Sequence, residues 1–555
     1  MQKTCSTCSK LFDITEEDLE FYRELSPSFE DEKVHIPPPT RCPECRLQRR
    51  LCFRNERFLY KRKCDLSGEN IVSSFKSDAI ETVYCKDSWW SDKWDALSYG
   101  IDFDFGKTFS EQFKVLLNNV PRLALAAVNT ENSDYTNYAK DVRNSYLFFG
   151  GGEVEDCLYS RFVNRSRDIV DCLSLFDCEL CYQTICSSHC YDCMFVANSR
   201  NCNECIFVED CESCSNCLMC FGLYKKEYCI LNKQLSKEDY KAYLKKITPL
   251  SREKIQQLQI EFLRLKSELP ERATHTYSCE NCSGDLLVNC SDCHYCFDLT
   301  EGEYCRHTAF MPHAYMCFDC TYGSPDGIRF SYELCSSVGT SNSIATFHCW
   351  MCESAHYCIE CHNSKDIFGC VGLRNKQYCI FNKQYSKEEY EVLAKKIAQH
   401  MQRTAEWGEF FDPQLSSYGY AQTVANEFFP QEREVSLERG YLWKDEEIKT
   451  GSSKYNIPGV ITEVEDSILK EVLYCKVSGK AYKIIPQELK WYRKMGIPIP
   501  ALCPDERHYQ RMAKRGSLHL WPRQCVKTNE TVLSSIPPEF PANVCSEEAF
   551  REMMR

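Results

Sequence analysis

The sequence predicts a mainly β protein with some α-helix: two short, cysteine-rich parallel β-solenoids with a nine-residue period, each followed by a capping helix, and flanked by zinc-ribbon-like modules. Three observations predict this fold class. Cysteine is concentrated in two blocks, a stretch of about twenty residues recurs at a constant offset of 150 residues, and cysteines within each block recur nine residues apart. Such fixed offsets are typical of internal repeats.

Composition narrows the class of protein. The chain has 555 residues, 40 cysteines, a net charge of -13 and 43% hydrophobic residues, which is enough for several packed cores and excludes wholesale disorder. It contains no apolar run long enough for a membrane helix and no secretory signal at its start, so we expect a cytoplasmic protein without a membrane partner. Because disulfides are rare there, the cysteines are expected to bind metal or to pack as small apolar groups.

The first element, residues 1–63, is predicted to be a zinc ribbon followed by a basic helix. Cys5-x2-Cys8 and Cys42-x2-Cys45 form a complete set of four ligands, since two such pairs supply four thiolates at tetrahedral geometry. Between the pairs, Thr15 is expected to cap a short amphipathic helix. We therefore predict one structural zinc site at Cys5, Cys8, Cys42 and Cys45.

This segment is similar to a known family. Its CSTCSKLFDITEEDLEFY stretch followed by RCPECR resembles the zinc-ribbon family whose signature joins Cys-x2-Cys, an aromatic Glu-Phe-Tyr helix and Cys-Pro-x-Cys-Arg. The resemblance covers roughly residues 5–46 and implies zinc on the same four cysteines. The whole arrangement also resembles a group of uncharacterised bacterial cysteine-repeat proteins with zinc-ribbon-like ends.

Residues 64–130 are predicted to be a degenerate ribbon with a helical connector, and residues 471–555 a degenerate double ribbon after a connector at 403–470. At an offset of 470 residues Cys5 aligns with Cys475, and at 461 Cys42 aligns with Cys503. In the three degenerate modules, serine, threonine or glutamate stands where the second cysteine of each pair would be. Because serine and threonine are poor zinc ligands, no tight metal is expected there.

The two predicted solenoids occupy residues 131–250 and 275–402, with a linker helix at 251–274 between them. A spacing of nine residues matches neither the roughly 3.6-residue period of an α-helix nor the seven-residue period of a coiled coil. Nine-residue repeats are known from parallel β-rolls. Asp or Asn precedes many cysteines, and both tolerate the left-handed conformation of a sharp corner. Ser236 and Ser386 are expected to begin the capping helices.

The solenoid cysteines have three possible roles. They can stack as small apolar side chains, bind zinc through some of the Cys-x2-Cys pairs, or hold an iron–sulfur cluster. The first is favoured, because a nine-residue repeat with a second cysteine three residues on produces Cys-x2-Cys without any metal.

Two basic stretches lie at equivalent places in the duplicated ends. Residues 41–63 and 490–527 each contain nine basic and two acidic residues, with aromatic residues interspersed. One interpretation is that they grip the phosphate backbone of RNA or DNA, and the other is that they are solvated or bind the chain's own acidic body. The candidate nucleic-acid contacts are Arg49, Arg50, Arg54, Arg57, Arg507, Arg511, Lys514 and Arg515.

No established catalytic motif is present: the sequence lacks GxxxxGK[ST], GxGxxG, HExxH and GxSxG. His348, His356 and His362 lie near cysteines, where a nucleophile or a mixed zinc site is conceivable. An enzyme is left open but is not favoured, no catalytic residue is assigned, and a small-molecule substrate is not expected. The sequence thus predicts a zinc-binding structural or interaction protein with a protein or nucleic-acid partner; the alternative is a thiol-rich metal-binding or iron–sulfur redox protein.

Overall fold

A computed structural model describes residues 1–445, 449–452 and 455–554. The described chain groups into two compact units, each made from segments far apart in sequence. Unit 1 comprises residues 1–125, 275–445 and 518–520, and unit 2 comprises residues 126–274 with the described residues among 446–517 and 521–555. Each unit therefore joins one stack of β-strands to the terminal modules from the opposite half of the chain.

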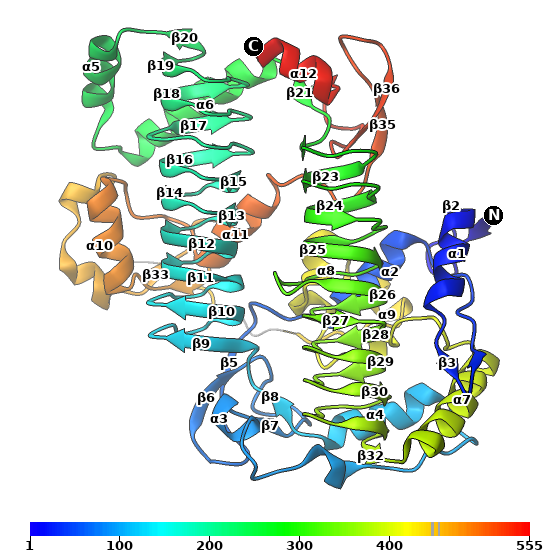
Figure 1. Ribbon diagram of the computed structural model, residues 1–555. Helices are drawn as coiled ribbons and strands as arrows, with labels where there is room; N and C mark the ends of the chain where they lie inside the picture. The colour runs from blue at the N-terminus through cyan, green and yellow to red at the C-terminus, as the bar shows by residue number, and fades with distance from the viewer. Residues whose placement is uncertain (446–448, 453–454, 555) are drawn as a thin grey trace. The chain divides into compact units, whose positions relative to one another are not determined.

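The first stack lies in unit 2 and is the column of short strands in cyan and green in Figure 1. Its strands are β9 (Ala127–Glu131), β10 (Asn137–Arg143), β11 (Phe149–Leu158), β12 (Arg161–Val170), β13 (Leu173–Phe176), β14 (Glu179–Tyr182), β15 (Ile185–Ser188), β16 (Tyr191–Ala197), β17 (Ile206–Glu209), β18 (Ser215–Phe221), β19 (Glu227–Ile230) and β20 (Lys233–Gln234). Helices α5 (Lys237–Ile247) and α6 (Arg252–Ser267) follow it.

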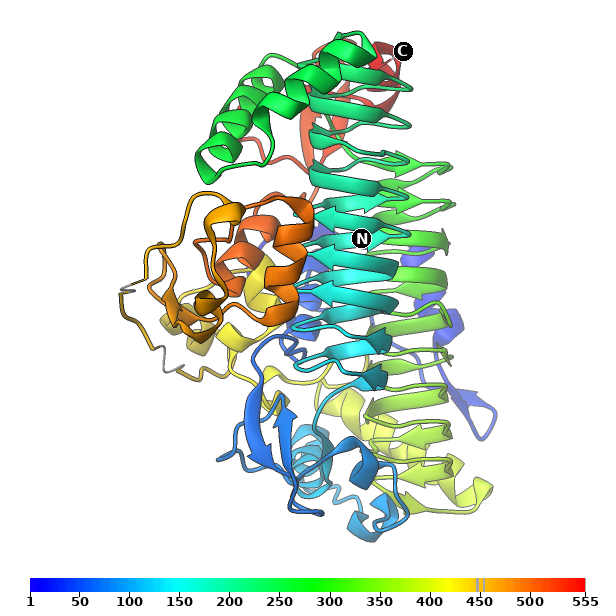
Figure 2. The same ribbon diagram turned by 90° about the vertical axis from the view of Figure 1, so that its left-hand side faces the viewer.

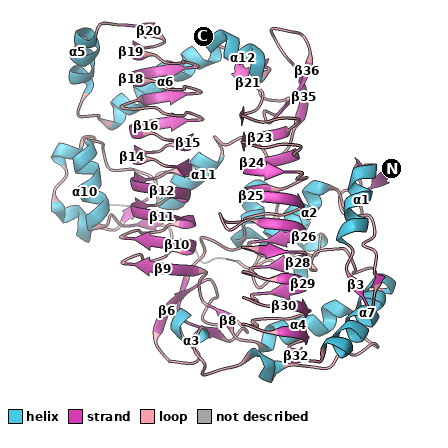
Figure 3. Cartoon of the chain, in the orientation of Figure 1, coloured by secondary structure: helices cyan, strands magenta, loops and turns pink. Residues whose placement is uncertain are grey.

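The second stack lies in unit 1 and is built in the same way, as the magenta strands of Figure 3 show. Its strands are β22 (Thr276–Tyr277), β23 (Ser283–Val288), β24 (His294–Glu303), β25 (Ala309–Phe318), β26 (Ile328–Cys335), β27 (Thr340–Ser341), β28 (Ile344–Phe347), β29 (Glu353–Ile359), β30 (Lys365–Phe368), β31 (Gln377–Ile380) and β32 (Lys383–Gln384). Helix α7 (Lys387–Arg403) follows, and then α8 (Val424–Phe428) and α9 (Arg433–Glu438).

Small α/β modules complete the two units. In unit 1 they are β1 (Gln2–Thr4), β2 (Leu11–Asp13), α1 (Glu16–Leu25), β3 (Ser28–Phe29), β4 (Glu32–Lys33), α2 (Pro43–Leu51), β5 (Tyr60–Lys63), β6 (Asn70–Ser73), β7 (Val83–Tyr84), α3 (Lys86–Trp89), α4 (Phe109–Asn119) and β8 (Arg122–Leu123). In unit 2 they are β21 (Glu271–Arg272), β33 (Leu473–Tyr474), β34 (Ala481–Tyr482), α10 (Pro486–Met495), α11 (Pro504–Met512), β35 (Trp521–Gln524), β36 (Thr531–Ser534), β37 (Val544–Cys545) and α12 (Glu547–Met554).

Most neighbouring strands in the stacks are parallel, and most paired residues lie twelve apart, not nine as the cysteine spacing predicts. Cys181 pairs with Cys193 and Cys217 with Cys229. The last pair of each stack, β19–β20 and β31–β32, is antiparallel, and Ala314 of β25 pairs with Ile328 of β26. Backbone φ is positive at every third residue through most of both stacks, so four corners separate paired residues. Inward positions thus recur every three residues. The nine-residue spacing of the cysteines is therefore a spacing between inward positions. The offset between neighbouring strands is set separately, by the hydrogen bonds between them.

The predicted corner residues have the predicted conformation. All eleven Asp and Asn residues that the sequence places before a cysteine have φ between 49° and 57°. Asn and Asp adopt this left-handed backbone conformation at a low energetic cost, because their short side chains can form hydrogen bonds with nearby backbone groups. These residues are Asp156, Asp171, Asp177, Asp192, Asn201, Asp210, Asn216, Asn281, Asn289, Asp292 and Asp319.

The residue after each of these corners points into the stack. In the first stack the inward residues form one continuous buried cluster, made mostly of cysteines and several valines, with one alanine, one phenylalanine, one leucine and one isoleucine. The thiols lie within hydrogen-bond distance of backbone carbonyls nine residues later; Cys193 Sγ, for example, is 3.4 Å from the Cys202 oxygen. Small side chains with a weak donor therefore fill a narrow interior while contacting its backbone.

The helices after the stacks begin where the sequence predicts. Ser386 and Glu389 form a reciprocal capping box at α7, and the Ser236 side chain accepts a hydrogen bond from the Asp239 amide at α5. The linker helix α6 contacts strands β17 and β18, and Figure 2 shows the green helices beside the upper end of this column of strands. Its buried face, with Leu258 and Phe262, joins the cluster outside the first stack. No helix among the described residues is long and apolar enough to cross a membrane.

Candidate metal centre

The four predicted metal ligands come together at the N-terminal module. Cys5 and Cys8 flank the turn between β1 and β2, while Cys42 and Cys45 lie at the start of α2. Their sulfur atoms all lie within 4.8 Å of one another, and the Cys8 and Cys42 sulfurs are 3.7 Å apart. Three of the thiols are buried and Cys8 is half-buried. This group can hold a metal ion.

Local structure explains why the pairs converge. The Cys5 oxygen accepts a hydrogen bond from the Ser9 amide, and Ser9 is left-handed, which folds the first pair into a knuckle. Pro43 occupies the first turn of α2, where its missing N–H costs nothing. The Ser6 amide donates to the Thr40 carbonyl at 3.0 Å and ties the first knuckle to the segment before the second.

The thiols influence one another electrostatically. A hydrogen bond with the Cys45 thiol lowers the pKa of Cys42 to about 5, and the same bond raises the pKa of Cys45. Burial is the main reason why the pKa of Cys8 is raised. Four sulfurs this close cannot all ionise without a compensating charge, which a bound cation would supply.

The three degenerate modules each bring their two remaining cysteines together. Cys525 and Cys545 sulfurs are 3.9 Å apart, and the Cys85 amide donates to the Cys64 sulfur at 3.2 Å. In the third module the Ser478 hydroxyl lies 3.7 Å from the Cys503 sulfur. Among the described residues, Cys5, Cys8, Cys42 and Cys45 form the one group of three or more candidate ligands at metal-binding distances.

Hydroxyl groups in these modules contact the remaining thiols. Burial raises the pKa of Cys64, but hydrogen bonds from Ser67 and from the Cys85 amide outweigh it and lower this pKa to about 6. The pKa of Cys525 is lowered to about 6 by Thr528 and neighbouring amides, against a raising effect of burial. Serine and threonine therefore solvate a thiol at positions where a ribbon would have a second ligand.

The basic residues proposed as nucleic-acid contacts are mostly inside the protein. Five of the eight are buried: Arg49, Arg50, Arg54, Arg507 and Arg511. Arg57 and Arg515 are half-buried, and Lys514 is exposed. Nucleic-acid binding stays a prediction, but the five buried guanidinium groups would have to leave their present partners to take part.

In unit 1, helix α2 places its arginines against the second stack. Arg50 Nη1 lies 2.6 Å from Glu333 Oε2 and 3.3 Å from Asp319 Oδ1, and Arg46 Nη2 lies 2.8 Å from Asp319 Oδ2. Burial raises the pKa of Glu333 to about 7. Burial also acts to raise the pKa of Asp319, but the two guanidinium groups outweigh it and lower that pKa.

In unit 2, helix α11 makes the equivalent contact with the first stack. Arg507 and Arg511 lie 2.5 Å and 2.9 Å from the two oxygens of Asp171, which is fully buried. Arg507 aligns with Arg46, and Asp171 and Asp319 are both corner residues before a cysteine. The duplicated basic helices thus bind acidic corner residues of the stacks. This contact agrees with the interpretation that the basic stretches bind the chain's own acidic body.

The histidines beside cysteines are buried among aromatic rings. His362 packs on Trp90 and Trp350, with ring centroids 5.0 Å and 4.5 Å away. Burial lowers the pKa of His348 and of His356 to about 4, so both are neutral near pH 7. His348 is a left-handed corner residue, so it points out of the stack while Cys349 points in.

Sequence reasoning missed the acidic partners of the basic helices. Asp171 and Asp319 were identified as corner residues by the cysteine that follows each, yet nothing local marks them as ion-pair partners. Glu333 and Glu409 carry no sequence signal at all; Glu409 lies 2.6 Å from Arg41 and 3.2 Å from Arg49.

Comparison with known proteins assigns neither a family nor a function to the chain. No family model matches the chain, and no curated protein matches it.

Proposed function

We propose that this protein is a non-catalytic interaction scaffold, in which one structural zinc ion stabilises the N-terminal module and two β-solenoids present their faces to a protein partner. The observation that carries the proposal is the group of four thiols at Cys5, Cys8, Cys42 and Cys45. A site of four protein ligands leaves no open position for a substrate, which favours a structural role.

Zinc suits this donor set better than other common metals. Thiolates disfavour magnesium and calcium, which take oxygen ligands. With zinc–sulfur bonds of about 2.3 Å, a tetrahedral site places its sulfurs roughly 3.8 Å apart. The 3.7 Å between Cys8 and Cys42 is close to that spacing. The resemblance to the zinc-ribbon family supports the same assignment.

We further propose that each stack is a right-angled β-solenoid with twelve residues per coil and four corners. The twelve-residue parallel offset between most neighbouring strands and the left-handed residues at every third position through most of both stacks support this geometry. In such a coil, cysteine serves as a small, polarisable packing side chain. All 40 cysteines are free thiols, which favours a reducing compartment such as the cytoplasm.

A protein partner is favoured over nucleic acid because the basic helices are neutralised internally. Arg50 and Arg511 already bind carboxylates of the stacks. The charge available to a phosphate backbone is therefore smaller than the sequence indicates, and the net charge of -13 opposes non-specific binding of a polyanion.

Metal analysis of full-length protein, purified anaerobically without chelators, tests the proposal. We expect about one zinc per chain, lost in Cys42→Ser and retained in Cys64→Ser, which alters a degenerate module. Loss of the ion should also expose the segment near residue 20 to proteolysis, because a structural zinc contributes directly to folding. Four or more metals per chain, or visible absorbance from iron and sulfide, would favour the thiol-rich redox alternative.

A further inference from the structure

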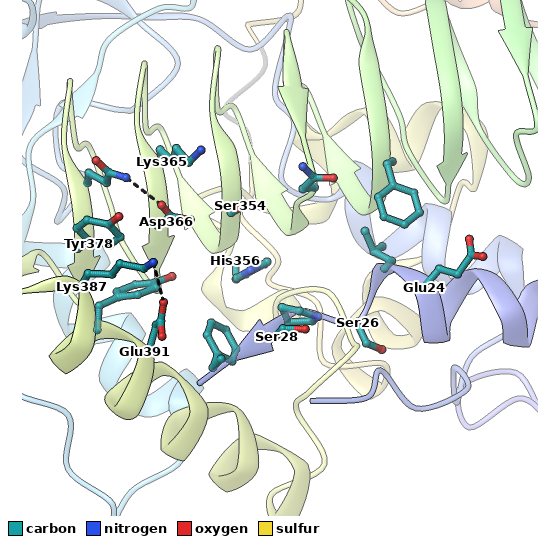
Figure 4. A pocket seen from close by; sticks show the side chains of 17 residues that line it. Glu24, Ser26, Ser28, Ser354, His356, Lys365, Asp366, Tyr378, Lys387 and Glu391 are labelled. Carbon is teal, nitrogen blue, oxygen red and sulfur yellow. Dashed lines mark hydrogen bonds and ion pairs between the residues drawn. The ribbon is translucent and has the colours of Figure 1, made fainter. Parts of the chain in front are cut away.

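A polar cavity of about 530 Å³ lies within unit 1, in a different place from the thiol group. Figure 4 shows its three walls: the corners of the second stack, the start of helix α7, and the chain from the end of α1 into β3. Its size is in the range of small-molecule sites. Nothing in the sequence predicts it, because its walls come from segments more than three hundred residues apart.

One wall is a regular column of corner residues twelve apart in sequence. From one end to the other the column contains Phe330, Asn342, Ser354, Asp366 and Tyr378, and all five have positive φ. Since neighbouring strands lie about 4.8 Å apart, the column spans roughly 19 Å. It has an aromatic ring at each end and an amide, a hydroxyl and a carboxylate between them.

His356 lies behind this column and lines the cavity from β29. His356 is 3% exposed, and its Nδ1 atom has no hydrogen-bond partner among the residues that the structure describes. A buried polar atom without a partner is costly unless something else bonds to it. As a neutral imidazole, His356 can exchange a hydrogen bond with a hydroxyl group without adding charge.

The charged residues around the cavity disfavour an anionic ligand. Lys365 is paired with Glu353 at 3.0 Å and Lys387 with Glu391 at 3.7 Å. Asp366 accepts a hydrogen bond from Gln377 at 3.0 Å. The lining contains more carboxylates than ammonium groups, so a phosphate or carboxylate would meet net repulsion.

We propose that this cavity binds a neutral carbohydrate, an oligosaccharide that lies along the column from Phe330 to Tyr378. Sugars have hydroxyl groups that match the amide, hydroxyl, carboxylate and imidazole of the wall, and apolar C–H faces that pack on aromatic rings. A few placed polar groups between aromatic surfaces are typical of specific small-molecule sites. The repeat of the column along one axis suits a ligand that is itself a repeat.

Calorimetric titration of the full-length protein with neutral tetrasaccharides of glucose, xylose and mannose tests this. We expect at least one to bind, and to bind more tightly than its disaccharide, because the longer chain reaches both aromatic ends. Asn342→Ala and Ser354→Ala should each weaken binding about five- to tenfold, the effect of one lost hydrogen bond. Both side chains lie at the surface of the stack, and the control variant, Asn363→Ala, carries the same cost of alanine at a left-handed corner.

Asn363→Ala is the matched control. Asn363 is an exposed, left-handed corner residue of the same stack, but it does not line the cavity. Its variant should bind as the native protein does. Absence of binding by every neutral saccharide at millimolar concentration, equal effects of Asn342→Ala and Asn363→Ala, or tighter binding of a sulfated heparin tetrasaccharide would each overturn the proposal.

Discussion

Each corner of the stacks requires a residue that tolerates a left-handed backbone conformation. Asn201 has φ of 53° and is exposed, with Cys202 buried immediately after it. We expect Asn201→Val to destabilise unit 2 by about 1–2 kcal/mol, because a β-branched side chain clashes with the carbonyl in the left-handed conformation. Asn201→Gly should change stability by less than about 0.5 kcal/mol, since glycine takes this conformation freely. Thermal unfolding followed by circular dichroism measures both, and equal losses would contradict the corner argument.

Buried histidines should make unit 1 sensitive to acid. Burial lowers the pKa of His348 and His356 to about 4, from an ordinary value near about 6.5. Around His348, Glu360 acts to raise the pKa, whereas Arg54 and Arg122 act to lower it. Between these pH values the unfolded chain binds protons that the folded chain does not, so stability falls as pH decreases from about 6.5 towards 4.

Each such histidine contributes a slope of about 1.4 kcal/mol per pH unit in that window. We expect His348→Phe to reduce the slope by roughly this amount, because phenylalanine fits beside Phe347 and Trp350 and does not titrate. Denaturant unfolding at a series of pH values measures it. An unchanged slope in His348→Phe would contradict this prediction.

At the scale of elements, the contact between basic helix and stack joins each terminal module to its unit. Aromatic residues accompany the ion pairs: Phe21 of α1 stacks on Phe318 with centroids 3.7 Å apart, and Trp491 of α10 packs on Tyr182 at 5.6 Å. Phe21 and Trp491 occupy aligned positions of the duplicated ends. The two modules therefore use the same surface chemistry on two different stacks.

Removing one partner of the buried cluster in unit 1 should be costly. Arg50→Ala leaves Glu333 buried without its closest cation and weakens the compensation of Asp319, so we expect a loss of about 3–5 kcal/mol in unfolding free energy. Chemical denaturation measures the loss. Arg23→Ala, on the exposed face of helix α1, should change stability by less than about 0.5 kcal/mol. Similar effects of the two substitutions would show that the ion pairs do not stabilise the unit.

At the scale of the whole molecule, internal pairing of the basic stretches limits binding to polyanions. Of the candidate contacts, only Arg57, Lys514 and Arg515 are at least partly accessible. Each phosphate contact contributes about -0.9 to the slope of log affinity against log salt on a duplex, or roughly -0.7 on a single strand. We expect no binding of single-stranded RNA or duplex DNA at physiological salt, measured by fluorescence anisotropy. A slope of about -4 or steeper would mean that the buried arginines become available to phosphates.

The grouping of modules with stacks also belongs to the whole molecule. The chain runs from terminal modules through two stacks to further modules, and each module joins the stack that lies farther away in sequence. Sequence comparison finds the duplications but not this exchange, because the offsets of 150, 461 and 470 residues relate like segments without showing which unlike segments pack together.

The sequence by itself determined the four-thiol group, the corner residues, the capping helices and the presence of two equivalent repeats. Each of these depends on local chemistry: the spacing of Cys5 and Cys8 in a knuckle, the tolerance of Asn201 for a left-handed backbone, the bond from Ser386 to its own helix. Such features need no knowledge of distant residues.

Tertiary structure alone decided the twelve-residue offset between strands, the burial of Arg50 and Arg511, and the cavity beside His356. The strand offset follows from hydrogen bonds between neighbouring strands. The spacing of cysteines does not show this offset, because valine or serine occupies many of the inward positions. The arginines are paired because Asp171 and Asp319, hundreds of residues away, are packed against them in a medium where an uncompensated charge is too costly. The cavity exists because three separate segments meet without filling the space between them.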